Sequence, residues 1–211
     1  MRANFTYFLV TFSAIFFIVD PLGLVPIFIA ITAHSTREKR RAMAKRATLL
    51  AFGLLSFFAI FGGLVFRLFG ITMPAMRMAG GFLLVMTAID MLRAQPTRTR
   101  SSPEEEMEFE NKADVAIVPL AMPLLAGPGS IVTVMVLAGR GGTYTAIIPV
   151  VISAALTCLI AYLLLRTADP IQRLLGRSGI AVLERIMGLL LAAIGVQFMV
   201  DGVMEVVKNL H

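Results

Sequence analysis

Long apolar stretches without charge are the feature that most restricts how this chain can fold. Residues 47–66 contain no Asp, Glu, Lys or Arg, and neither do residues 115–139. A helix needs about 20 consecutive apolar residues to cross the hydrocarbon core of a bilayer. Only 15% of the 211 residues are charged, whereas a soluble domain carries about 25%. The chain therefore has too few polar residues to cover itself in water, and the sequence predicts an integral membrane protein.

Six long apolar stretches, three of them free of charged residues, follow one another along the chain. They comprise residues 5–31, 47–66, 74–92, 115–139, 143–165 and 179–203. Helix-breaking residues interrupt two of them, Asp20-Pro21-Leu22-Gly23 in the first and Ala126-Gly127-Pro128-Gly129-Ser130 in the fourth. We therefore predict an all-α polytopic membrane protein with six transmembrane helices, of which spans one and four are broken.

The two halves of the chain resemble each other. Pro21 and Pro128, each followed by glycine within two residues, are 107 residues apart, and the Arg-x-x-Gly segments that begin at Arg77 and Arg185 are 108 apart. Because three spans is an odd number, the second half must enter the membrane from the opposite side. The sequence thus predicts two inverted three-helix repeats, residues 1–93 and 115–211, joined by a polar cytoplasmic linker at 94–114.

The two breaks are the candidate binding site. Proline removes a backbone N–H and clashes with the carbonyl four residues earlier, and freed backbone groups survive in hydrocarbon only inside protein or around a polar cavity. Broken helices at equivalent places in inverted halves indicate a substrate site near the midplane. The alternative is that both prolines merely kink their helices. The candidate substrate-binding residues are Asp20, Pro21, Gly23, Gly127, Pro128, Gly129 and Ser130, with Gln197 as a further polar wall residue.

Charged residues inside the predicted spans have two interpretations each. Asp20 either caps the second half of its broken helix or binds a coupling cation, H⁺ or Na⁺. Arg77 and Arg185 either extend toward lipid headgroups or gate the pathway by pairing with carboxylates. Glu184 lies next to Arg185, and Asp20 and Asp201 are the other candidate partners.

The sequence contains little that indicates other classes of function. His34 and His211 do not form a ligand set, Cys158 is the only cysteine, and no nucleophile triad, phosphate loop or redox motif is present. We expect no enzyme, metal or cofactor. The net charge of +6 is explained by the excess of basic residues in cytoplasmic loops, so no nucleic-acid partner is expected. The oligomeric state is left open.

Two motifs resemble those of a known family. Residues 20–28, Asp-Pro-Leu-Gly-Leu-Val-Pro-Ile-Phe, resemble the (D/N)PxGxxPxF signature of the MarC family of inner-membrane proteins, and residues 119–131 resemble its PLAxPxxAGPGxI signature. The family is similar to LysE-type exporters and includes small neutral amino acid transporters of the SnatA type. The resemblance implies an inner-membrane transporter of a small polar metabolite, of the glycine or alanine type, that works by alternating access. The alternatives are a carrier of an ion or another metabolite, and a non-transporting scaffold or accessory protein.

The distribution of basic residues predicts the orientation. Of the 19 Lys and Arg residues, thirteen follow spans one, three and five, and five lie on the opposite side, Arg185 being left out because it lies within span six. Basic residues accumulate in cytoplasmic loops. Both termini are therefore expected outside, in the periplasm of a Gram-negative cell. Alkaline phosphatase fused to either terminus should be active, and phosphatase inserted within 95–112 should be inactive. The reverse pattern would overturn the orientation.

Overall fold

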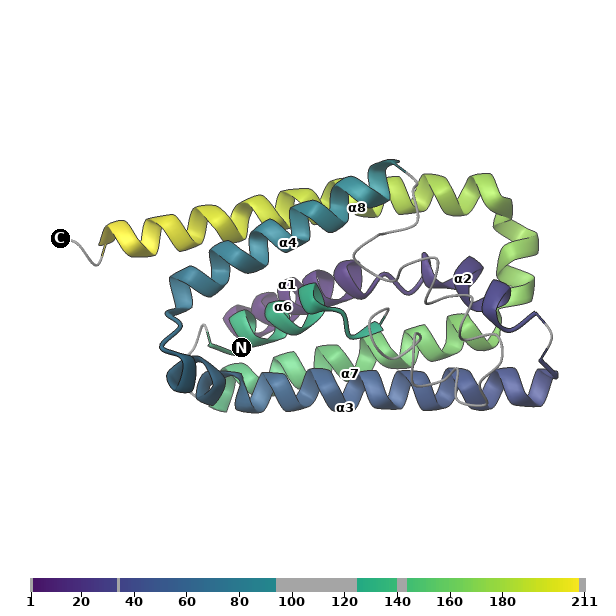
Figure 1. Cartoon of the computed structure of the whole chain (residues 1–211), viewed down its shortest axis with the longest axis horizontal. Coiled ribbons are helices and arrows are strands. Elements are labelled where there is room, and N and C mark those ends of the chain that lie inside the picture. The colour runs from purple at the N-terminus through teal and green to yellow at the C-terminus, as the bar shows by residue number, and fades with distance from the viewer. Residues whose placement is uncertain (1, 34, 94–124, 140–143, 209–211) are drawn as a thin grey trace.

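The structure is a computed structural model in which residues 2–33, 35–93, 125–139 and 144–208 are described (Figure 1). All regular elements of this part are α-helices: α1 (Arg2–Val19), α2 (Leu24–Ile31), α3 (Arg37–Phe69), α4 (Met73–Arg93), α6 (Pro128–Gly139), α7 (Tyr144–Arg166) and α8 (Ala168–Lys208). By length and composition, five helical stretches can cross a membrane, and α6 is a shorter apolar helix. The predicted all-α membrane class is confirmed. The predicted linker at 94–114 and residues 115–124 of the fourth predicted span lie outside the described residues.

Helix α3 begins ten residues before the predicted apolar span. The side-chain oxygen of Thr36 accepts a hydrogen bond from the backbone N–H of Lys39 at 3.3 Å, and Glu38 lies in the first turn. A hydroxyl cap and an acidic first turn both stabilise a helix N-terminus. The helix ends at Gly70, whose φ of 65° lies in the left-handed region that glycine adopts without a steric penalty.

The turn predicted between spans five and six is helical instead. Helix α8 begins at Ala168 and includes Asp169 and Pro170 in its first turn, where a missing backbone N–H removes no intrahelical hydrogen bond. The helical geometry is interrupted only at Gly176, with φ 64° and ψ 178°. The sequence correctly indicated a change of direction, and the chain makes it in two steps, at Thr167 between α7 and α8 and at the non-helical Gly176, with a short helical segment between them.

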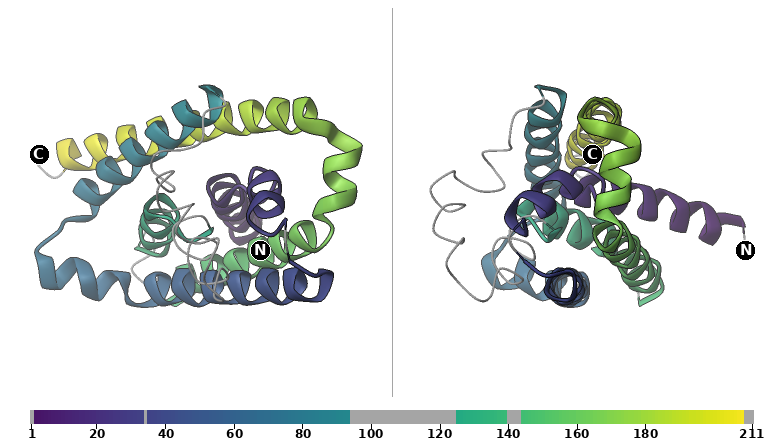
Figure 2. Two further views of the ribbon diagram at one scale, coloured as in Figure 1. Left: turned by 45° about the vertical axis from the view of Figure 1, so that its right-hand side comes forward. Right: turned by 90° about the vertical axis from the view of Figure 1, so that its right-hand side faces the viewer.

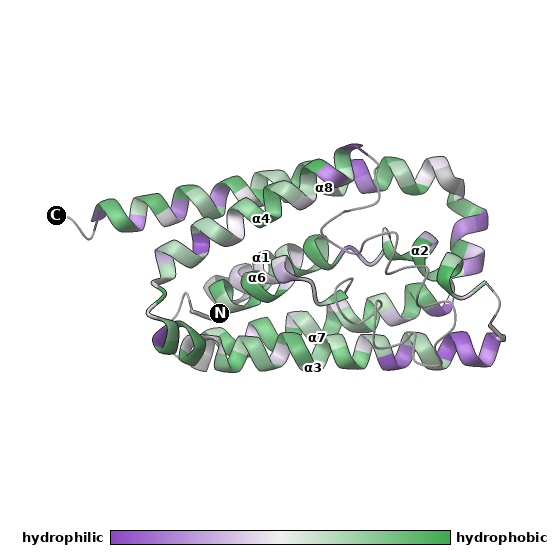
Figure 3. Ribbon diagram, viewed as in Figure 1, coloured by the Kyte–Doolittle hydropathy of each residue, from purple (hydrophilic) through white to green (hydrophobic). Residues whose placement is uncertain are grey.

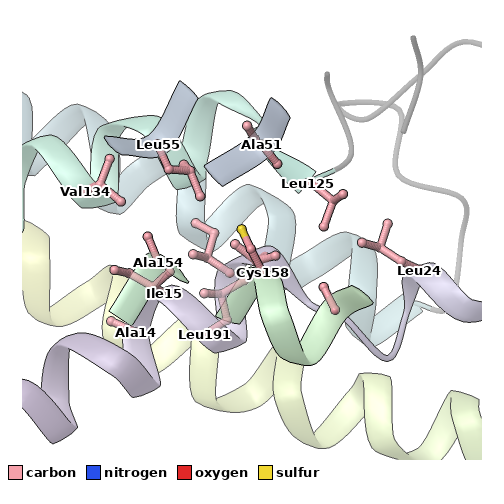
Figure 4. Close-up of a cluster of buried hydrophobic side chains, with 14 of the residues drawn as sticks. Ala14, Ile15, Leu24, Ala51, Leu55, Leu125, Val134, Ala154, Cys158 and Leu191 are labelled. Carbon is pink, nitrogen blue, oxygen red and sulfur yellow. The ribbon is translucent and has the colours of Figure 1, made fainter. Parts of the chain in front are cut away.

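Helices α2 and α6 and the C-terminal part of α1 lie inside a frame formed by the long helices α3, α4, α7 and α8, and the N-terminal part of α1 projects from it (Figure 2). The inner face of the frame and the central helices share one buried apolar cluster, which includes Ala14 and Ile15 of α1, Ala154 of α7 and Leu191 of α8 (Figure 4). In α6 every residue from 132 to 138 is buried. The molecule therefore places α6 and the end of α1 where lipid does not reach them.

Glycines bring α4 and α8 into close contact. An added Cβ at Gly195 would lie 2.8 Å from the backbone oxygen of Gly81, and one at Gly202 would lie 2.9 Å from the backbone oxygen of Pro74. The contacts of Gly188 with Met91 and Ala88 complete an antiparallel arrangement. Since lipid is as apolar as leucine, membrane helices associate through close packing at such small residues. The spacing of seven residues between Gly188, Gly195 and Gly202 keeps all three on one helix face.

The outward faces of the frame are apolar, as the hydropathy colours show (Figure 3). Many large hydrophobic side chains are exposed there, among them Leu49, Phe57, Leu64, Leu163 and Leu189. A water-soluble monomer rarely exposes apolar area on this scale. These surfaces fit the hydrocarbon of a bilayer.

Alanine at Gly81 should destabilise the fold, because its Cβ would overlap the backbone oxygen of Gly195, which cannot move without shifting α8. We expect a loss of about 1–3 kcal/mol, the usual cost of overpacking, measured by thermal unfolding in detergent. Gly63→Ala is the matched control, since nothing lies within 4 Å of an added Cβ there. Equal melting temperatures for the two variants would contradict a glycine-dependent α4–α8 contact.

Candidate functional site

The first break separates α1 from α2 at Asp20. This residue has φ 47°, a conformation that is unusual for a residue with a side chain, and it is only 2% exposed. Its Oδ1 accepts a hydrogen bond from the backbone N–H of Gly23 at 3.1 Å. A Cβ on Gly23 would overlap the carboxylate, so glycine is the residue that fits here. The Asp20 side chain thus holds the turn that leads into α2.

The segment predicted as the second break, residues 126–130, lies at the start of α6. Pro128 is the first residue of this helix, where proline costs no intrahelical hydrogen bond. The hydroxyl of Ser130 is buried and donates to the carbonyl of Leu125 at 3.4 Å. Gly127 and Gly129 are partly buried and Pro128 is exposed. As at the first break, a short apolar helix begins at the predicted break: α2 begins directly after Gly23, and α6 begins at Pro128 itself.

The structure brings the second break against the end of α1. A Cβ on Gly129 would lie 2.9 Å from Cδ1 of Ile18, two residues before Asp20. At the other end of α6, the Tyr7 hydroxyl donates to the carbonyl of Leu137 at 2.6 Å. Helices α1 and α6 therefore pack antiparallel. Leu24 and Leu125, which flank the two breaks, belong to the same buried cluster (Figure 4).

Sequence analysis did not name Thr11 or Thr133, which belong to a set of buried hydroxyls near this contact. Within the described part of the chain, five buried hydroxyl groups have no hydrogen-bond partner, and four of them belong to residues that are almost fully buried: Thr11, Thr133, Ser153 and Thr157. They come from α1, α6 and α7, which contact one another. A polar group without a partner is costly in an apolar environment. The sequence feature that could have identified these residues is a Ser or Thr on an otherwise apolar helix face.

Thr11 and Thr133 lie at the same level of the bundle. Gly129, Thr133 and Leu137 are four residues apart and so share one side of α6. Gly129 contacts Ile18, and the carbonyl of Leu137 accepts from the Tyr7 hydroxyl. On α1, Thr11 lies between Tyr7 and Ile18. The two threonines therefore face the α1–α6 contact about midway along its length.

The predicted gating charges have different surroundings. Arg77 forms an ion pair with Glu205 of α8, a partner that sequence analysis did not name. Its repeat mate Arg185 is exposed, and Glu184 is partly buried. The Arg77–Glu205 pair joins the first turns of α4 to the last turns of α8 and so adds to their glycine contact.

A second ion pair, also missed, lies at the other end of the frame. The guanidinium of Arg40 donates to both carboxylate oxygens of Asp169, at 3.0 and 3.1 Å. The same guanidinium lies 5.7 Å from the ring centre of Phe28 in α2, within the range of a cation–π interaction. Arg40 therefore connects α3 with both α2 and the first turn of α8.

Gln197 lies apart from the breaks. Its side-chain amide donates to Asp201 Oδ1 at 2.7 Å. It lines a cavity of about 330 Å³ between α1, α6 and α8, together with Ser13, Leu137 and Phe198. No break residue lines this cavity, and its walls are mainly apolar. The structure brings the two breaks together and leaves Gln197 in a different environment.

Within the described ranges, no group of three or more His, Cys, Asp or Glu side chains could hold a metal ion. At the start of α2 the N–H groups of Gly23, Leu24 and Val25 already donate to Asp20 and Leu22. The chemistry available around the breaks is one buried carboxylate, several hydroxyls, and the backbone N–H groups at the start of α6. Such groups can bind and release a small polar molecule.

The long apolar helices and the buried polar breaks define a multi-pass all-α integral membrane protein. The chain belongs to the MarC family of integral membrane proteins, whose family model matches residues 5–207.

Curated relatives match over nearly the whole chain. A UPF0056 membrane protein of Methanocaldococcus jannaschii is 39% identical over 197 residues, 93% of this chain and 96% of the relative. One from Aquifex aeolicus is 37% identical over 202 residues, 96% of this chain and 94% of the relative. The UPF0056 membrane protein YhcE of Escherichia coli is 32% identical over 207 residues, 98% of this chain and 96% of the relative. No solved structure matches.

Removing the charge of Arg77 should destabilise the protein, because Glu205 would lose its partner in a partly buried position. Arg77→Gln should cost about 1–3 kcal/mol, between the values for exposed and buried pairs, measured by thermal unfolding in detergent. The exchange Arg77→Glu with Glu205→Arg should recover at least half of the loss. Arg185→Gln, its exposed repeat mate, is the matched control. Equal losses at both arginines would argue against the ion pair.

Proposed function

We propose that this protein transports a small polar metabolite across the inner membrane by alternating access around the two breaks, with small neutral amino acids such as glycine or alanine as substrates. Both termini lie outside in this proposal. The observation that carries it is Asp20, a carboxylate that is 2% exposed in a non-helical turn between two apolar helices. The second break lies against the same end of α1.

The cost of this carboxylate supports a functional role. An acidic side chain at the centre of a membrane helix costs at least about 2.5 kcal/mol, and such residues commonly mark substrate or ion pathways. Asn could form the hydrogen bond to Gly23 N–H without that cost. A buried carboxylate in this turn suits the binding of a cation.

The surrounding groups suit a zwitterion. The substrate carboxylate would meet the positive dipole ends at the starts of α2 and α6, and the backbone N–H groups at the start of α6. The substrate ammonium would meet Asp20 and the carbonyls near Val19 and Ala126. The unpaired hydroxyls of Thr11 and Thr133 offer further hydrogen bonds along the α1–α6 contact. A coupling ion, H⁺ or Na⁺, would also be held at Asp20.

The helix contacts support two inverted repeats, 1–93 and 115–211, with 94–114 as the linker and with spans one and four broken. If α1, α3 and α4 correspond to α6, α7 and α8, each contact between halves should have a counterpart. Helix α1 contacts α7 as α3 contacts α6, and α1 contacts α8 as α4 contacts α6. The equivalent pairs α3–α7 and α4–α8 also pack together.

Two alternatives are a carrier of an ion or another metabolite and a non-transporting scaffold. The buried hydroxyls favour a polar ligand and so weigh against the scaffold. A flux screen of purified protein in liposomes distinguishes the three: uptake of glycine or alanine supports the proposal, uptake of other solutes supports the first alternative, and no flux supports the second.

The charge of Asp20 should matter more for transport than for folding. Asn at position 20 can still accept the hydrogen bond from Gly23 N–H, so we expect Asp20→Asn to melt within a few degrees of the parent. It cannot exchange a proton or attract an ammonium, so uptake of labelled alanine should fall about tenfold or lose its dependence on pH.

Asp90→Asn in α4 is the matched control and should transport like the parent. Asp20→Ala, which loses both the charge and the acceptor, should reduce both stability and flux. If Asp20→Asn matched the parent in flux at every pH, Asp20 would serve only to hold the turn.

A further inference from the structure

A second cavity lies between α3 and α7, away from the breaks. Its volume is about 300 Å³, and its lining includes Lys45, Leu49 and Phe52 from α3 and Cys158, Leu159 and Tyr162 from α7. Neither the breaks nor the unpaired hydroxyls line it. Its walls are mainly apolar, so it does not suit a free zwitterion.

The cavity has a polar end and an apolar end. Helices α3 and α7 run antiparallel side by side (Figures 1 and 2), so Lys45, near the start of α3, is close to Tyr162, near the end of α7. Further into the span, Leu49 is 65% exposed and Leu159 52% exposed. This end of the cavity therefore opens toward lipid acyl chains, whereas the other end carries an ammonium and a phenol.

Further basic residues surround the polar end. Arg41 is one turn before Lys45, and Arg166 is one turn after Tyr162. Because the helices are antiparallel, both arginines extend the same end of the cavity, and both are exposed. The hydrophilic residues at this end of α3 and α7 are visible in Figure 3. Basic residues next to a membrane span attract anionic lipid headgroups.

We propose that the cavity between α3 and α7 binds one anionic phospholipid, with its phosphate at Lys45 and Tyr162 and one acyl chain against Leu49, Phe52 and Leu159. The shape and the charge distribution match this ligand at both ends. A lipid without net charge would leave the basic residues at the polar end of the cavity without a counter-charge. A free phosphate would leave the apolar end of the cavity empty. The proposal does not depend on what the protein transports.

Native mass spectrometry of the full chain in neutral detergent tests this proposal with two probes of identical acyl chains, dioleoylphosphatidylglycerol and dioleoylphosphatidylcholine. We expect one phosphatidylglycerol to be retained preferentially. Lys45→Gln should weaken its binding roughly fivefold, the factor that corresponds to about 1 kcal/mol per basic residue at a membrane surface. Arg67→Gln, an exposed basic residue in the last turn of the same helix, is the matched control and should retain the lipid.

A second variant tests the acyl-chain part of the site. Ala155 also lines the cavity, so Ala155→Phe places a ring in it. This variant should lose retention of phosphatidylglycerol even though Lys45 is intact. An unchanged melting temperature in lipid-free detergent is the control for folding. Three results would overturn the proposal: equal retention of the two lipids, phosphatidylglycerol binding that is unchanged in Lys45→Gln, or displacement of the lipid by glycerol phosphate, which indicates a free-phosphate site. A lipid-independent dimer that Ala155→Phe disrupts would identify a second copy of the chain as the occupant and would also overturn it.

Discussion

The hydrogen-bonding requirement of the backbone in hydrocarbon controls this structure. Each N–H and C=O inside a bilayer must find a partner within the protein, and so the chain crosses as helices. The places where it departs from a helix must then be enclosed. The turn at Asp20 meets this condition, because its carboxylate accepts from Gly23 N–H and the surrounding residues are buried. The long helices α3, α4, α7 and α8 provide that enclosure.

Enclosing the breaks also determines where small residues are needed. The α4–α8 contact, on one side of the frame, depends on glycines whose missing side chains let two backbones approach. Gly129 plays a similar part at the centre, since it allows the start of α6 to touch Ile18. Ion pairs at Arg77–Glu205 and Arg40–Asp169 join the ends of these helices. Both pairs link the first half of the chain to the second, so an opening motion between the halves would have to break or rearrange them.

Hydropathy and break residues were sufficient to predict the helical membrane class and the neighbourhood of Asp20. An uncharged stretch of about 20 residues has few alternatives to a membrane helix, and proline beyond the first turn of a helix removes an intrahelical hydrogen bond. Prediction was less complete at the α7–α8 connection, where the turns at Thr167 and Gly176 lie within the predicted region but the helical segment between them was not predicted. It also missed Glu205 as the partner of Arg77 and the hydroxyls of Thr11 and Thr133, because these depend on which helix faces which.

The sequence by itself determined that this protein lies in a membrane, that it forms helices, and that the Asp20 carboxylate lies between two of them. These properties follow from local composition, since each residue contributes to hydropathy and helix propensity independently of distant residues. Only the tertiary structure decided that Gly129 lies against Ile18 and that Gln197 lines a separate apolar cavity. It also decided that Lys45 and Tyr162 line the same cavity between α3 and α7. The apolar faces of membrane helices are nearly interchangeable in hydropathy, so their pairing is set by shape, by close packing at glycine and by a few polar contacts between residues far apart in the chain.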